Sequence, residues 1–136
     1  EGMDEWKKSA LEILLKRKNG AAPSLVAESF RLVGKPADAV PFFEMAMQRD
    51  GATIQTTAGL ADCKKDVDAM QRVIKSATHD DASSYWYWLA NIRVLQWYVE
   101  SGGNKTDAIA MVNRLRKKDA SLGGAPFMAQ FNNILD

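Results

Sequence analysis

The stretch LVAESFRLVGKPADAVPFFEMAMQRDG, residues 25–51, decides the fold of this chain. It contains two helical segments around the turn at Gly34, because glycine ends helices. Small and aromatic residues recur around this turn at short, regular spacings: Ala27, Phe30, Ala39, Phe43 and Ala46. Small side chains let two helices approach closely, and large rings fill the space beside them. The stretch therefore predicts a tightly packed helical hairpin that ends at Gly51.

These residues and spacings resemble the tetratricopeptide repeat family. A weaker match in the same phase is carried by Gly103, Ala108, Val112 and Leu115. Between the two matches, Ala69 and Val73 suggest a degenerate unit that lacks the turn glycine. The resemblance implies antiparallel helical hairpins stacked as a short right-handed α-α superhelix, with about three degenerate repeats over residues 21–120. It also implies a non-catalytic scaffold that binds a protein or peptide.

Helical signals continue through the rest of the chain. The predicted helices cover about 4–18, 23–33, 37–49, 53–63, 66–77, 83–100, 105–118 and 126–135. We therefore expect an all-α fold of about eight helices in a single domain, residues 1–136, with a leading helix over 4–18. The segment 125–135 has one apolar face and one polar face, as a helix that caps a repeat array requires. The alternative is a non-repeat helical bundle in which the spacings arise by chance.

Composition excludes several classes of function. The 18 basic and 17 acidic residues give a net charge of +1, which argues against a dedicated nucleic-acid or membrane-surface binder. Basic residues do cluster at 114–118, but this is the last turn of a predicted helix, where cations are favoured anyway. No apolar run approaches the roughly 18 residues that a membrane span requires. We therefore expect a protein partner, no nucleic acid and no membrane span.

The compartment stays open. Cys63 is the one cysteine of the chain, so no internal disulfide can form and the fold needs no oxidising environment. The start, Glu1-Gly2-Met3-Asp4, has no signal-peptide pattern and does not begin with methionine. We expect a soluble protein and favour the cytoplasm. Export remains open, because such a start fits a segment taken from a longer protein.

Catalytic and metal-binding motifs are absent from the sequence. His79 is the one histidine, so a histidine pair cannot form. The loop segment His79-Asp80-Asp81 offers carboxylates just before a predicted helix, where they cap the helix and favour its dipole. Cys63 lies beside Lys64 and Lys65, which could lower the thiol pKa, but we expect an inert, partly buried thiol. The sequence therefore predicts no enzyme, no metal and no cofactor.

The predicted helix over residues 83–100 is unusually aromatic. Four consecutive aromatic residues point all around a helix, so they cannot all face one core. One continuous stripe is predicted to be core: Tyr85, Trp88, Leu89, Ile92, Leu95 and Val99. Trp86, Arg93 and Trp97 fall on another side, where they either pack against a neighbouring helix or contact a partner. Tryptophan and arginine are common anchors of protein interfaces.

The family resemblance adds groove positions, since the first helix of each hairpin lines its concave surface. These positions are Ala90, Arg93, Trp97 and Glu100 in one unit and Ser24, Glu28 and Arg31 in another. The candidate partner-binding residues are therefore Trp86, Arg93, Trp97, Glu100, Glu28 and Arg31. Ser24 and Glu28 do not fit the family's clamp for a peptide carboxylate. Two other functions stay open: self-association as a homodimer, and a regulatory helical domain of a larger protein.

Overall fold

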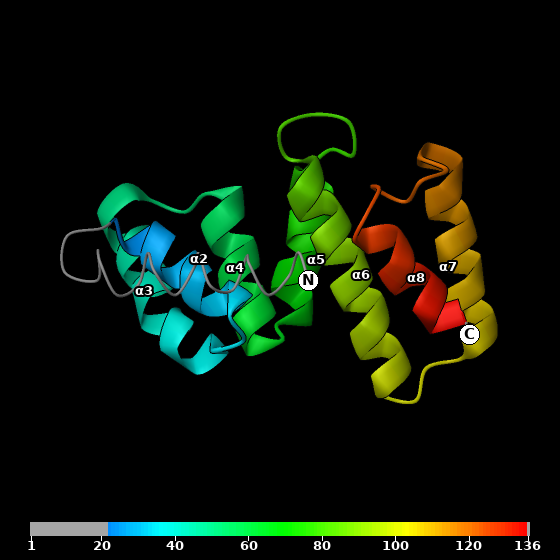
Figure 1. Ribbon diagram of the computed structural model, residues 1–136, viewed down its shortest axis with the longest axis horizontal. Coiled ribbons are helices and arrows are strands. Elements are labelled where there is room, and N and C mark those ends of the chain that lie inside the picture. The colour runs from blue at the N-terminus through cyan, green and yellow to red at the C-terminus, as the bar shows by residue number, and fades with distance from the viewer. Residues whose placement is uncertain (1–21, 136) are drawn as a thin grey trace. The chain divides into compact units, whose positions relative to one another are not determined.

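The computed structural model of the chain describes residues 22–135, and all regular structure within them is helical (Figure 1). The seven helices found there are α2 (Pro23–Leu32), α3 (Pro36–Asp50), α4 (Ile54–Lys64), α5 (Val67–Ser76), α6 (Ser84–Glu100), α7 (Lys105–Lys118) and α8 (Phe127–Leu135). The predicted all-α class is confirmed for these residues, and each helix lies close to its predicted bounds. The leading helix predicted over 4–18, which would be the eighth, lies outside the described residues.

The described helices divide into two compact units. The first unit ends at Asp66 and contains α2, α3 and α4, whereas the second begins at Val67 and contains α5 to α8. The single domain expected over residues 1–136 stays a prediction. Each unit has buried apolar side chains of its own.

In the first unit, α2 and α3 form the hairpin that residues 25–51 predict. Gly34 ends α2 with a φ of 80°, a backbone conformation that favours glycine. Ala27 and Ala39 are completely buried and cluster with Phe43. The predicted burial of small residues in this hairpin is therefore confirmed.

Helix α4 packs on α3 and α2 within the first unit. It begins with a capping box, in which the Thr53 hydroxyl accepts a hydrogen bond from the Thr56 N–H at 3.1 Å. A Cβ atom added at Gly59 would lie 2.3 Å from Cζ of Phe43. The Phe43 ring thus occupies the space that a side chain on α4 would need, which holds α3 and α4 close together.

In the second unit, α6 is the central helix, and it contacts α5, α7 and α8. The largest fully buried side chains of this unit are Met70, Trp88, Ile92, Leu95, Val112, Leu122 and Phe131. Helix α8 directs its apolar face inward: the Phe131 ring meets the Trp88 ring edge to face, with 6.2 Å between centroids. Of the apolar face predicted for the last helix, Phe127 and Phe131 are therefore buried within this unit.

The buried face of α6 differs from the predicted stripe. Four of its six residues are buried as predicted: Trp88, Leu89, Ile92 and Leu95. Tyr85 and Val99 were expected in the core but are 36% and 38% exposed. Tyr87 and Ala90 are instead 5% and 0% exposed, so the expected position of Ala90 in a groove is wrong. The reason is that helices pack on α6 from several directions, whereas a single stripe assumes one buried face.

Candidate functional site

The six candidate partner-binding residues lie in both units. Glu28 and Arg31 belong to α2, and Trp86, Arg93, Trp97 and Glu100 belong to α6. The two sets have different surroundings.

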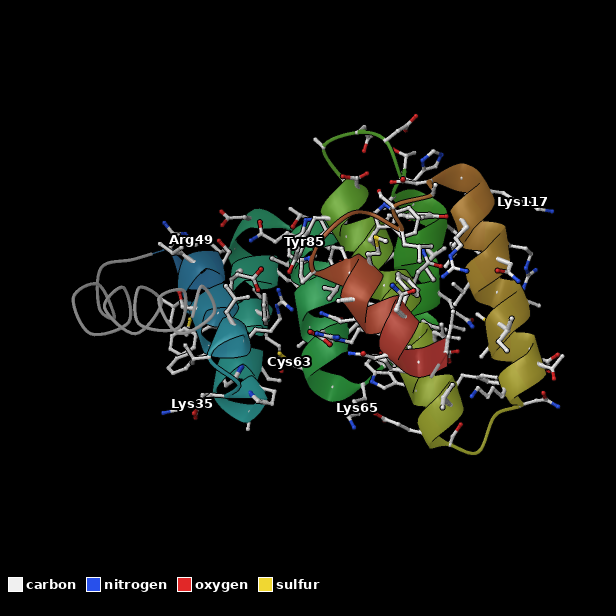
Figure 2. All side chains as sticks on the ribbon, turned by 45° about the vertical axis from the view of Figure 1, so that its right-hand side comes forward. Lys35, Arg49, Cys63, Lys65, Tyr85 and Lys117 are labelled. Atoms are coloured by element: carbon white, nitrogen blue, oxygen red, sulfur yellow. The ribbon has the colours of Figure 1, made fainter. Side chains whose placement is uncertain are left out.

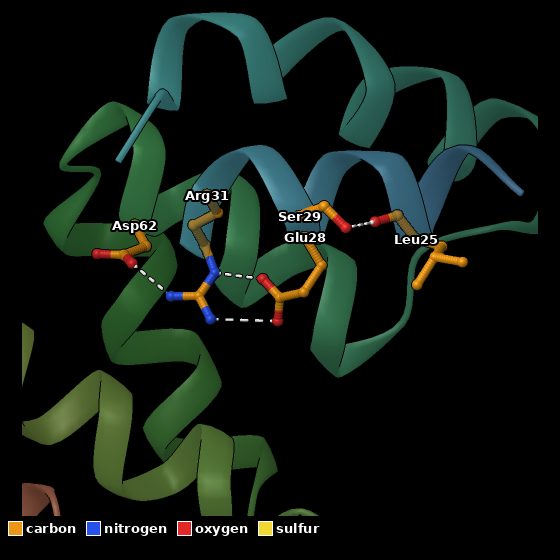
Figure 3. Close-up of polar contacts among 5 residues, drawn as sticks. All are labelled: Leu25, Glu28, Ser29, Arg31 and Asp62. Atoms are coloured by element: carbon orange, nitrogen blue, oxygen red, sulfur yellow. Dashed lines mark hydrogen bonds and ion pairs between the residues drawn. The ribbon is translucent and has the colours of Figure 1, made fainter. Parts of the chain in front are cut away.

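Arg31 is the centre of an ion-pair network inside the first unit (Figure 3). Its Nη1 atom donates to Oδ2 of Asp62 in α4 at 2.8 Å, and its Nε and Nη2 atoms donate to the Glu28 carboxylate. The side chains of Arg31, Asp62 and Glu28 are only 6%, 11% and 17% exposed. Arg31 thus joins α2 to α4, Glu28 contacts the same guanidinium group, and these contacts give both residues a structural role.

Cys63 is the residue after Asp62 on α4, next to this ion-pair network in the sequence (Figure 2). Burial raises the pKa of its thiol to about 11, and the negative charge of Asp62 adds to the rise, while Arg31 acts in the opposite direction. The thiol therefore stays protonated near neutral pH. This agrees with the predicted inert, partly buried cysteine and opposes a reactive thiolate.

A partly exposed strip runs along α6, and it is made of Trp86, Arg93 and Trp97. We refer to these three residues as the α6 strip. All three side chains are intermediate in exposure, and Glu100 at the end of the helix is exposed. Trp86 meets Tyr85 edge to face with 4.7 Å between centroids, and Nη1 of Arg93 donates to Oε1 of Gln96 at 3.1 Å. The strip therefore contains side chains that make contacts within α6, and it leaves surface that a partner could cover.

The loop before α6 contains the predicted capping carboxylates. The Asp81 carboxylate accepts hydrogen bonds from both the backbone N–H and the hydroxyl of Ser83, at 2.7 and 2.5 Å. The Ser83 hydroxyl bond, the contact with Thr78 and the Ser83 N–H bond hold the pKa of Asp81 below its usual range. These bonds order the turn that leads into α6. The predicted capping is wrong: Ser83 is the N-cap residue of α6, and the cap has no side-chain hydrogen bond.

The sequence reasoning missed a pocket of about 240 Å³ between α5, α6 and α7. Its polar lining comes from Tyr87 and Asn91 of α6 and from Arg114 and Lys118 of α7. Each pair has an i, i+4 spacing, which places both members on one face of their helix. That spacing is visible in the sequence, but the meeting of the two faces depends on how the helices pack.

The polar groups of this pocket are held by a few contacts. Nζ of Lys118 donates to the Tyr87 hydroxyl at 3.1 Å and lies 5.6 Å from the centroid of the same ring. The Asn91 amide donates to the Tyr87 carbonyl oxygen at 2.8 Å. Arg114 is exposed, and within residues 22–135 it makes no hydrogen bond or ion pair. The pocket therefore presents two positive charges without a neutralising carboxylate in its lining.

Metal binding gains no support from the described part of the chain. There, no cluster of three or more histidine, cysteine, aspartate or glutamate residues is arranged to hold a metal ion.

Across residues 22–135, every helix is too short or too polar to cross a membrane. Comparison of the sequence and structure with protein families, curated proteins and solved structures found no match.

Proposed function

We propose that this chain is a non-catalytic helical interaction module that binds a protein or peptide through the α6 strip. The observation that carries the proposal is the partial exposure of Trp86, Arg93 and Trp97 on a helix that buries Tyr87 and Trp88. Tryptophan and arginine dominate the binding energy of many protein interfaces. The strip presents both residue types on neighbouring turns of one helix.

The proposal includes a tetratricopeptide-like arrangement, with α2–α3 as one repeat unit and α6–α7 as another. The buried small residues of α2–α3 support the first unit. In the second proposed repeat, α6–α7, Ala108 and Val112 are 1% and 0% exposed, at the positions that the resemblance assigns to packing. A Cβ atom added at Gly103 would lie 2.4 Å from Cε2 of Tyr98, so packing requires glycine at this turn.

The strip alone would not suffice for a stable complex. Completing the burial of two partly exposed indoles contributes on the order of 2 kcal/mol. A micromolar complex requires roughly 8 kcal/mol of binding free energy. A partner must therefore make contacts beyond Trp86 and Trp97, and Arg93 and Glu100 are the nearest polar candidates.

Affinity capture from cells of the source organism tests this proposal. Three baits are compared: the wild-type chain, Arg93→Ala with Trp97→Ala, and Met45→Ala with Arg49→Ala. The last pair is a matched control, because Met45 and Arg49 also form an i, i+4 pair of an apolar residue and arginine, on the exposed face of α3. All baits must first show equal helicity and thermal midpoints. The proposal requires a protein that wild-type and control baits capture and that the α6 variant loses.

Self-association is the second candidate function, and a specific observation favours it. Tyr85 and Val99 leave large apolar surface exposed on α6 itself, at 36% and 38%. Exposed apolar surface is often covered in an oligomer. Light scattering of the purified chain separates the two functions, since only self-association predicts a stable dimer without a partner.

A further inference from the structure

We infer that the pocket between α5, α6 and α7 binds the carboxylate of a glutamate side chain that an acidic peptide presents. This site is separate from the α6 strip. At about 100° per residue, Tyr87 and Asn91 lie roughly 120° around α6 from the strip. The inference therefore does not depend on Trp86, Arg93 or Trp97.

Charge is the first argument for a carboxylate. Arg114 and Lys118 lie one turn apart on α7, and both line the pocket. The nearest acidic residue in sequence, Asp119, directs its carboxylate to its own loop: it accepts from the Ser121 N–H at 2.9 Å and from the Ser121 hydroxyl at 2.7 Å. Guanidinium and ammonium groups are the usual partners of carboxylates in proteins.

The hydrogen-bond donors point to the same ligand. The Tyr87 hydroxyl accepts from Lys118, so its own proton remains available for an incoming acceptor. An ammonium group carries three N–H donors, of which the bond to Tyr87 uses one. A carboxylate offers only acceptor oxygens, which matches this set of donors.

Size and apolar lining favour a side chain over a larger molecule. The volume of about 240 Å³ is below the roughly 300–1,000 Å³ typical of sites for drug-sized ligands. Ile74, Met111 and Leu115 supply an apolar wall. Such a wall suits the methylene groups of glutamate, while the two cations reach its carboxylate.

Nuclear magnetic resonance titration of the full chain tests this inference. The probe is the capped peptide acetyl-Gly-Gly-Glu-Gly-Gly-amide, and the matched probe has glutamine in place of glutamate. We expect the glutamate peptide to shift the side-chain signals of Asn91 and Arg114, and the glutamine peptide to leave them in place. Binding should weaken as salt rises, because the contact is between charges at the surface.

Two double variants separate the pocket from the general positive field of this helix end. Arg114→Gln with Lys118→Gln should weaken binding of the glutamate peptide roughly tenfold. Arg116→Gln with Lys117→Gln removes the same charge from the same turns, but neither residue lines the pocket, and Lys117 extends away from α7 (Figure 2). This control should change the affinity less than about twofold. Tyr87→Phe keeps the ring but removes the hydroxyl group, so it should weaken binding of the glutamate peptide a few-fold. This variant replaces the Arg114→Gln, Lys118→Gln test if that double variant does not fold.

Three results would overturn the inference. Equal weakening by both double variants would mean that the peptide senses only the overall charge. Unchanged Asn91 and Arg114 signals with the glutamate peptide would mean that the pocket does not take a carboxylate. Shifts with inorganic phosphate but not with the peptide would assign the pocket to a different anion. None of these results bears on the α6 strip, so the two sites are tested independently.

Discussion

The guanidinium group of Arg31 in α2 lies 2.8 Å from the carboxylate of Asp62 in α4, and Glu28 contacts the same guanidinium. All three side chains are largely buried, so the arginine neutralises two carboxylates that water reaches poorly. Removing one partner of a buried ion pair is costly, because the remaining charge keeps its desolvation penalty. This network is the main polar link between the helices of the first unit that the described residues show.

We expect Arg31→Ala to lower the free energy of unfolding by about 3 kcal/mol, since two buried carboxylates lose their counter-ion. The control is Arg49→Ala, an exposed arginine on α3, which should change stability by less than about 0.5 kcal/mol. Urea unfolding followed by circular dichroism measures both variants. Equal effects of the two substitutions would show that the network does not stabilise the unit.

The contact between Phe43 and Gly59 predicts that a glycine-to-alanine substitution lowers the stability of the chain. Glycine to alanine inside a helix normally stabilises it by about 1 kcal/mol. At Gly59 the new Cβ atom would lie 2.3 Å from the Phe43 ring, so we expect Gly59→Ala to destabilise the chain instead. The loss should be about 1–3 kcal/mol. Phe43→Leu should reduce the added cost of Gly59→Ala in a double-mutant cycle, and additive effects would refute the contact.

Two neighbouring glycines before α8 allow the stability cost of backbone strain to be measured with and without a packing clash. Gly123 and Gly124 have φ values of 84° and 77°, so alanine is strained at both positions. A Cβ atom at Gly123 would also lie 2.4 Å from Cγ of Trp88, whereas a Cβ atom at Gly124 would point into open space. We expect Gly124→Ala to cost about 1 kcal/mol and Gly123→Ala about 3 kcal/mol. Thermal unfolding measures both, and equal costs would mean that Trp88 does not pack on this loop.

The Cys63 thiol gives a prediction for alkaline pH. Its pKa is about 11 in the folded chain, against an ordinary value of 9.0. At pH 8 the folded chain should therefore react with a disulfide reagent about a hundredfold more slowly than the chain unfolded in urea, because only the thiolate reacts. Equal rates in the two states would contradict the raised pKa.

The raised pKa of Cys63 also determines how this residue affects the free energy of unfolding. Because the folded pKa is above the unfolded pKa, the folded state holds the thiol proton more tightly between pH 9 and 11. The contribution of Cys63 to stability is complete below about pH 9 and is lost as pH rises through 11. Cys63→Ser should remove this part of the alkaline decline, measured by urea unfolding across that range. A decline that is identical in the wild-type chain and the variant would assign it to other groups.

Much of the helical structure could be predicted from the sequence, because helix ends carry local signals. Glycines such as Gly34 and Gly51 stop helices, and both adopt positive φ values in the structure. The burial predicted for the small side chains within the stretch 25–51 is also confirmed. Such signals act within one or two turns of a helix, so a single sequence contains them.

The candidate sites depended on contacts that no local pattern contains. Arg31 and Asp62 are 31 residues apart, and so are Tyr87 and Lys118 of the pocket. A helical wheel gives the face of a residue but not which helices cover that face. For this reason Tyr85 was wrongly expected in the core, while the burial of Tyr87 was missed.

The most direct test of the proposed function is the dissociation constant of peptides selected from a random library on the wild-type chain. We measure each selected peptide against wild type, Arg93→Ala with Trp97→Ala, and the control Met45→Ala with Arg49→Ala. Loss of an interface anchor costs at least about 2 kcal/mol, so the α6 variant should bind roughly 30-fold more weakly, while the control stays within about twofold. A library that yields no binding peptide, or peptides that bind all three chains equally, would contradict the α6 strip as the binding surface.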